Sequence, residues 1–121
     1  MNTNLNSQKS PDTFMLYNEV YNLYIILFPL LNRFPKSQKF TLRQQIDSTF
    51  LDLLVCVWQY QVSQQQNKGN YIKKMIYLFD KGKMLLRLSS DLNILPHHHY
   101  LSLYDKFEII GKLIGGLSKK L

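Results

Sequence analysis

Apolar residues recur along this chain of 121 residues at alternating steps of three and four, the spacing of one face of an α-helix. No stretch alternates between apolar and polar residues for long enough to indicate a β-strand. The pattern predicts four helices, at about residues 11–33, 41–64, 71–91 and 96–118, after a flexible N-terminus at residues 1–9. The expected fold is all-α, with residues 10–121 forming one antiparallel up-down four-helix bundle.

The first predicted helix carries two adjacent rows of apolar side chains, one mainly aromatic and one aliphatic. The rows are Phe14, Tyr17, Tyr21, Tyr24, Phe28 and Leu31, and Leu16, Val20, Leu23, Leu27 and Leu30. Two rows form a face wide enough to contact more than one neighbour. This is more apolar surface than one small bundle needs, so we expect an oligomer. Ser10 is the expected N-cap before Pro11, and Pro29 should kink the last turn because it lacks an N–H.

Polar residues and prolines set the limits of the other three helices. Thr41 and Gln44 have the spacing of a capping box, in which each side chain accepts a hydrogen bond from a backbone N–H of the first turn. The polar stretch QQQNKGN, residues 64–70, is expected to separate the second helix from the third. Pro96 is expected to open the fourth.

Lysine and arginine outnumber the acids by 15 to 8, which gives a net charge of +7. This balance favours an anionic partner: nucleic acid, an acidic protein or an anionic membrane. The one cysteine, Cys56, lies in an apolar run and is expected in the core, and it leaves no disulfide within the chain. The N-terminus is polar, and the apolar run from Val20 to Leu31 is shorter than the roughly 20 residues of a membrane span. We therefore expect a soluble cytoplasmic protein without a membrane span.

The turn RFPKSQKF, residues 33–40, joins two apolar segments although it is half basic. With the residues that follow, it contributes four cations in eleven positions and no acid: Arg33, Lys36, Lys39 and Arg43. Pro35 favours an extended turn, and Phe34 and Phe40 are expected to fold back and anchor it. The turn is a candidate contact for an anionic partner, and the alternative is a solvated loop.

The third predicted helix offers a second basic surface. At about 100° per residue, five of its cations lie within half the circumference, opposite Ile72, Ile76, Phe79 and Leu86. These cations are Lys73, Lys74, Lys81, Lys83 and Arg87. A solubilising face does not need charges of one sign, so we expect an anionic partner here too. Alternatively, Arg87 pairs with Asp91 one turn further on.

Gly111 and Gly115 are spaced four residues apart on the fourth predicted helix. This spacing permits close approach of a backbone, either within the subunit or across an oligomer interface. Each glycine costs roughly 1 kcal/mol of helix stability, which suggests that something packs there.

The chain offers little chemistry for catalysis or for metal binding. His97, His98 and His99 are consecutive, and helical neighbours about 100° apart cannot close one tetrahedral site. There are two glutamates, no glycine-rich phosphate loop and no nucleophile elbow. We expect neither an enzyme, nor a metal site, nor a cofactor.

The chain resembles the four-helix-bundle family that includes the accessory variability protein of diversity-generating retroelements. The resemblance lies in three stretches, which occur in this order: FPLLNRFPKSQKFTLRQQI, LLRLSSDL and FEIIGKLIGGL. The matching features are a proline late in the first helix, a Phe-Pro-Lys-Ser turn, a Leu-Arg-Leu near the end of the third helix and a Gly-Gly ending. They correspond to Pro29, residues 34–37, residues 86–88 and residues 108–116. The resemblance covers about residues 13–118.

This resemblance implies a homopentameric ring or barrel that associates with the reverse transcriptase of the element and with its RNA. We therefore expect a non-catalytic accessory protein that supports mutagenic retrohoming. Its basic surface would bind the reverse transcriptase and template RNA or cDNA, with weak sequence preference. The alternative is a stand-alone interaction module that binds an acidic protein or a membrane and has no reverse transcriptase partner.

Overall fold

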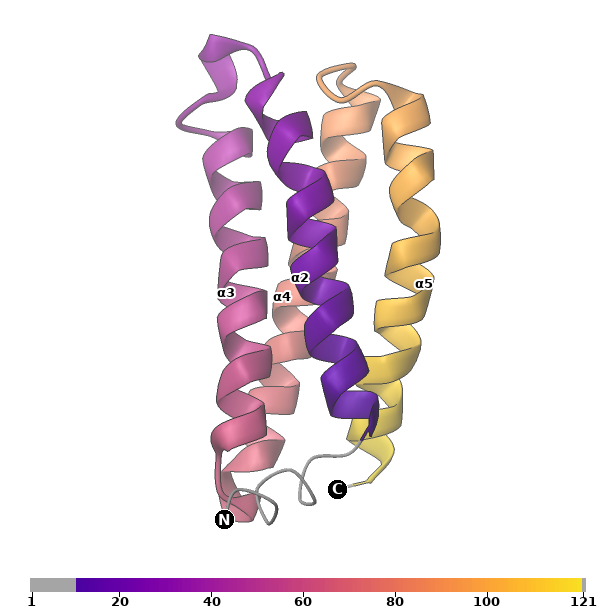
Figure 1. Cartoon of the computed structure of the whole chain (residues 1–121). Helices are drawn as coiled ribbons and strands as arrows, with labels where there is room; N and C mark the ends of the chain where they lie inside the picture. The colour runs from indigo at the N-terminus through magenta and orange to yellow at the C-terminus, as the bar shows by residue number, and fades with distance from the viewer. Residues whose placement is uncertain (1–10, 121) are drawn as a thin grey trace.

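The computed structural model describes residues 11–120 as a bundle of four long helices (Figure 1). They are α2 (Pro11–Asn32), α3 (Leu42–Val62), α4 (Gln65–Asp91) and α5 (His97–Lys119), and a short 3-10 helix, η1 (Lys36–Gln38), lies between α2 and α3. No strand occurs among residues 11–120. The helices run alternately up and down, and each contacts two neighbours but not the helix diagonal to it. The all-α antiparallel bundle expected from the sequence is thus the observed fold.

The aliphatic row of α2 forms its share of the core. Leu16, Val20, Leu23 and Leu27 are fully buried, whereas Tyr21 and Phe28 of the aromatic row are about half exposed. A helix in a square bundle points only one stripe at the shared axis, and the aliphatic row takes that place. Tyr17, Tyr24 and Leu31 of the aromatic row also pack in or against the core, and α2 contacts both α3 and α5, as its wide apolar face predicts. The exposed side chains of the aromatic row leave an apolar outer surface on α2.

The segment Thr13–Asn32 of α2 also has the length and composition of a membrane-spanning helix. The expectation from the sequence rested on Val20–Leu31 alone and so underestimated this apolar stretch. Its length does not distinguish it from a membrane span. What ties it to the bundle is the buried aliphatic row, which packs with the buried residues of the other helices in one core.

The connection between α3 and α4 is shorter than expected. Residues 65–70 belong to α4, so the predicted break at 64–70 is wrong and only Ser63 and Gln64 separate the two helices. Lys68 makes a contact across this connection: its Nζ donates a hydrogen bond to the carbonyl oxygen of Tyr60 at 2.6 Å and lies 4.4 Å from the centre of the Tyr60 ring. This contact fastens the first turns of α4 to the end of α3.

The capping box expected at Thr41 and Gln44 does not form. The Thr41 side chain makes no capping hydrogen bond to α3, and its hydroxyl donates instead to Gln38 Oε1 at 2.7 Å. The η1 turn places Gln38 within reach and so diverts the hydroxyl from the helix. The expected N-cap Ser10 and the expected flexible residues 1–9 lie outside the described residues.

A close contact between α3 and α4 involves a glycine that the sequence pattern did not single out. Gly82 of α4 is buried against the ring of Phe50 on α3, and a Cβ atom added at Gly82 would lie 2.5 Å from Phe50 Cζ. No side chain larger than hydrogen fits there unless the ring moves. Cys56 lies in the same core, and burial raises the pKa of its thiol, as expected for a core residue.

Candidate nucleic-acid interface

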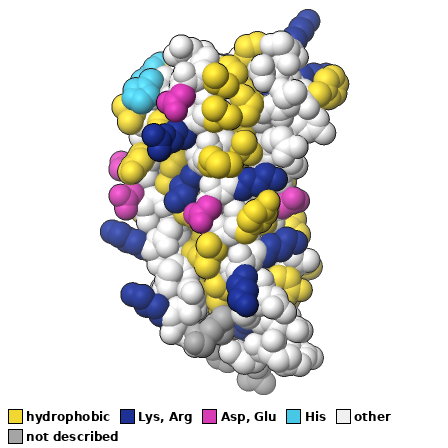
Figure 2. Space-filling view, turned by 180° about the vertical axis from the view of Figure 1, so that it is seen from behind, with side chains coloured by type: hydrophobic (Ala, Val, Ile, Leu, Met, Phe, Trp, Pro, Cys, Tyr) yellow, Lys and Arg dark blue, Asp and Glu magenta, His cyan; other side chains and the backbone are white. Residues whose placement is uncertain are grey.

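The charges of the described helices are unevenly distributed around the bundle. Helices α2 and α3 together contain one cation, Arg43, whereas α4 alone contains six. In Figure 2, which views the bundle from behind, Lys and Arg side chains lie on both sides of a broken column of hydrophobic side chains. The cations of the four helices are thus concentrated along α4 and α5.

Three lysines of α4 are available for an anionic partner. Lys73 and Lys74 are exposed and Lys81 is partly exposed. Within residues 11–120, no carboxylate lies within ion-pair distance of these three amines. They form the part of the predicted basic surface that no acid neutralises, and they are called the lysine patch below.

The other two predicted cations of α4 have acidic neighbours. Lys83 Nζ lies 3.8 Å from Asp80 Oδ1 and 4.5 Å from the centre of the Phe79 ring. Arg87 Nε lies 3.9 Å from Asp91 Oδ2, so the alternative pairing considered for Arg87 is the one observed. Both ion pairs are exposed and add little stability, but each reduces the local positive charge.

The basic turn is anchored by one of its two phenylalanines. Phe34 is buried, whereas Phe40 is 77% exposed, which corrects the expectation that both fold back onto the bundle. Arg43 donates a hydrogen bond from Nη2 to Asn32 Oδ1 at 2.7 Å, and this bond joins the ends of α2 and α3. Arg33, Lys36 and Lys39 are exposed.

The turn and the lysine patch do not form one continuous surface. The turn lies at one end of the bundle between α2 and α3, and α4 begins at the opposite end (Figure 1). Lys73 and Lys74 belong to the first half of α4. The structure therefore contains two separate basic regions.

The three histidines lie at the start of α5, near the basic turn. His97 Nδ1 lies 3.1 Å from the Ser90 hydroxyl, and the rings of His98 and His99 are 4.1 Å apart. Desolvation, with smaller effects from His98 and Arg33, lowers the pKa of His99. Among residues 11–120, no group of three or more His, Cys, Asp or Glu side chains is arranged to hold a metal ion.

Gly111 and Gly115 border an open groove between α4 and α5. An added Cβ at Gly111 would be in ordinary contact with Phe79 at 3.5 Å, and one at Gly115 would meet nothing within 4 Å. Within the subunit, Gly111 thus meets only the side chain of Phe79 and Gly115 meets no neighbouring atom, so no backbone approaches either glycine closely. Their predicted role in an oligomer interface stays a prediction.

This α4–α5 groove consists of two adjoining hollows of about 570 and 400 Å³, which share Lys83 and Gly111. The first is lined by three aromatic side chains of α5, Tyr100, Tyr104 and Phe107. The second is lined by Ile76, Phe79, Ile114 and Gly115. Ile76 was expected on the buried side of its helix but is 39% exposed at this groove.

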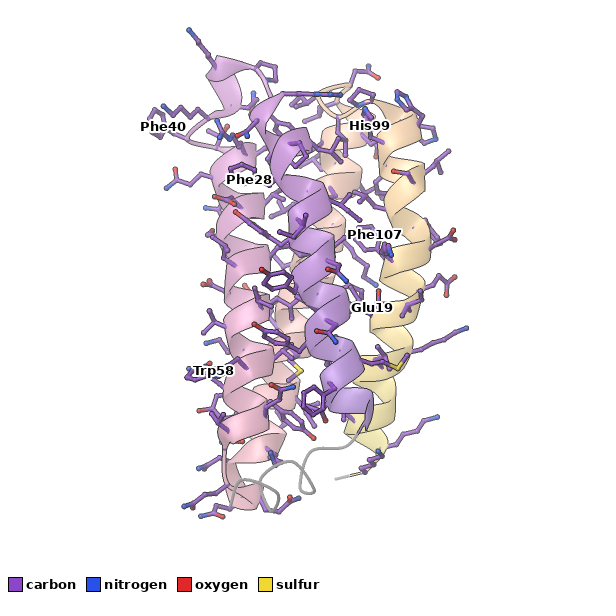
Figure 3. The ribbon with its side chains drawn as sticks, in the orientation of Figure 1. Glu19, Phe28, Phe40, Trp58, His99 and Phe107 are labelled. Carbon is purple, nitrogen blue, oxygen red and sulfur yellow. The ribbon has the colours of Figure 1, made fainter. Side chains whose placement is uncertain are left out.

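The outer side of α3 bears an apolar ridge that was not predicted from the sequence. Its members are about 40–50% exposed and are spaced by four, three and four residues: Leu51, Val55, Trp58 and Val62. Figure 3 shows Trp58 pointing away from the bundle. These four residues form a second apolar row on α3, on the side opposite the row of buried residues. The row is visible in the sequence, so the ridge could have been predicted.

The fold and the charge distribution define the class of the protein, an all-α four-helix bundle with one basic side. The chain belongs to the bAvd-like family, that of the accessory variability determinant, whose sequence model matches residues 14–121. The resemblance inferred from three stretches of sequence is thereby confirmed. The proteins of this family are accessory and non-catalytic. No curated protein and no solved structure matches the chain.

Proposed function

We propose that this protein is a non-catalytic accessory factor of a diversity-generating retroelement. In this role it binds the reverse transcriptase of the element and the template RNA or the cDNA, and it supports mutagenic retrohoming in the cytoplasm. The working form is a homopentamer. Membership of the bAvd-like family over residues 14–121 is the observation that carries the proposal.

The lysine patch supports the nucleic-acid part of this role. Lys73, Lys74 and Lys81 project from one rigid helix, and no acid lies within ion-pair distance of them in the described part of the chain. Such an array attracts phosphates without reading bases, because phosphate contacts carry no direct sequence information. The basic turn, at the other end of the bundle, supplies a second contact for an acidic surface or a polyanion.

The nucleic-acid part is tested by measuring affinity for RNA and for single-stranded DNA over a series of salt concentrations. Replacing Lys73, Lys74 and Lys81 by Gln should weaken binding to every sequence alike. The slope of log affinity against log salt should flatten by about 0.7 for each single-strand phosphate that the variant no longer neutralises. The control replaces the same three lysines by Arg, which keeps their charge, and it should bind like the parent. Equal affinities for the parent and the patch variant would contradict this role, and the lysines would then face an acidic protein.

The partner and the assembly are tested separately. A reverse transcriptase encoded beside this protein and co-expressed with it should co-purify in a stable complex. Light scattering should give a mass five times the 14.4 kDa of one chain. Failure to bind any reverse transcriptase, with nucleic-acid binding intact, would favour the stand-alone interaction module.

A further inference from the structure

The α3 ridge is an unpartnered surface of unusual composition. Trp58 and Val62 are each 53% exposed, and the spacing of the four ridge residues is that of a helix seam that packs against another helix. The surrounding charges of α3 are mainly acidic, because Asp47 and Asp52 are accompanied only by Arg43 at the far end of the helix. The ridge therefore suits a partner surface that is apolar and basic.

The α4–α5 groove has the complementary properties. Its floor is apolar, formed by Ile76, Phe79 and Ile114, and the absent side chains of the two glycines keep it open. Its cations are Lys83, Arg87, Lys112 and Lys119, and its acids are Asp80 and Glu108. The groove thus carries more positive than negative charge.

The two surfaces belong to different sides of the same molecule. The ridge points outward from α3, and the groove lies between α4 and α5, so one copy cannot fill its own groove. A protruding surface and a hollow surface on one chain are the elements of a head-to-tail contact between copies. Trp is also the residue type that most often dominates the energetics of an interface.

We propose that the α3 ridge of one copy lies in the α4–α5 groove of the next copy, with Trp58 packed beside Gly111 and Gly115. Head-to-tail contacts of this kind close into a ring when the rotation allows it. The inference rests on the proposed oligomer and identifies its interface. It also gives a reason for two helical glycines that make no close contact within the subunit.

To test this proposal, the ridge and the groove are each altered by a substitution. The mass of each variant is then measured by light scattering in the absence of nucleic acid. Trp58→Arg places a cation in a groove that is already basic. Gly115→Leu fills the groove, and because its Cβ meets nothing within 4 Å, the subunit should fold normally by circular dichroism. Phe40→Arg is the control for Trp58→Arg, since it makes an aromatic-to-Arg change at a side chain that is 77% exposed on the turn. The two interface variants should raise the dissociation constant by about tenfold or more and become monomeric at micromolar concentration, whereas the control should assemble like the parent.

Mixing the two variants tests the head-to-tail arrangement itself. Trp58→Arg retains an intact groove and Gly115→Leu retains an intact ridge, so the mixture should form one-to-one dimers and nothing larger. A parent oligomer that survives both substitutions would overturn the inference and leave the proposed oligomer intact. If only one of the two substitutions disrupts the oligomer, or if the mixture forms no dimer, the ridge and the groove do not meet. A monomeric parent would remove both the inference and the proposed pentamer.

Discussion

The hydroxyl of Tyr24 on α2 donates a hydrogen bond to Asp47 Oδ1 on α3 at 2.5 Å. This hydrogen bond connects the part of α2 near its middle to the first turns of α3, and it lies outside the core of aliphatic side chains. Desolvation by burial, together with the hydrogen bond and the negative charge of Asp47, raises the pKa of Tyr24 from 10.0 to about 12.

The raised pKa makes the stability of the protein depend on pH in the alkaline range. Folded Tyr24 keeps its proton up to about pH 12 while the unfolded chain loses it near pH 10, so the folded state binds more protons in between. The contribution of Tyr24 to the free energy of unfolding is therefore complete below about pH 10 and is lost as the pH rises to about 12. Urea unfolding in this range should show a smaller loss of stability for Tyr24→Phe than for the parent. Tyr21→Phe, at a half-exposed tyrosine of the same helix, should behave like the parent.

A methyl group at Gly82 should destabilise the bundle. Gly82→Ala would place Cβ 2.5 Å from Phe50 Cζ, and moving this buried ring should cost about 2–3 kcal/mol, more than the roughly 1 kcal/mol gained from helix propensity. Gly116→Ala is the matched control, because nothing lies within 4 Å of its Cβ position, and it should stabilise α5. Thermal unfolding of the two variants should shift in opposite directions. A Gly82→Ala protein as stable as the parent would show that Phe50 can yield without cost.

Replacing Lys68 should loosen the start of α4. Lys68→Met keeps the aliphatic stem beside the Tyr60 ring but removes the hydrogen bond to the Tyr60 carbonyl oxygen, at a cost of about 1 kcal/mol. Amide hydrogen exchange should become faster in the first two turns of α4 and stay unchanged near Leu86, which is buried in the core. Lys73→Met, at an exposed lysine of the same helix, should leave both regions as in the parent. Unchanged exchange in Lys68→Met would mean that backbone hydrogen bonds alone hold these turns.

The sequence was sufficient for the number, type and order of the helices, because each contains a regular apolar row that no other element type would produce. It did not decide which row of α2 faces the core, since Leu23 and Phe28 are both apolar and only packing against the other helices distinguishes them. It also misplaced the start of α4, because QQQNKGN has the composition of a break, and its contact through Lys68 with Tyr60 on the preceding helix is not visible in the pattern.

For the candidate sites, the sequence identified the cations but not their surroundings. The Lys83–Asp80 ion pair could have been read from the sequence, because the two residues are three apart on one helix and Lys81 has no acid at such a spacing. Gly82 and Gly115, in contrast, look equivalent in the sequence, and the structure buries one against Phe50 and leaves the other beside an open groove. The difference between the two glycines depends on distances between helices, which a pattern along one chain does not contain.

The uneven distribution of cations gives the bundle a permanent electric dipole moment across its width. In solution of low ionic strength, the field of a nearby polyanion would exert a torque on the whole molecule and turn its α4 side forward before any contact forms. The orientation would then be set during the approach, over distances of about one Debye length, roughly 10 Å at 0.1 M salt. The rate at which such a molecule is captured is therefore sensitive to where its charges sit, even when their total is held constant.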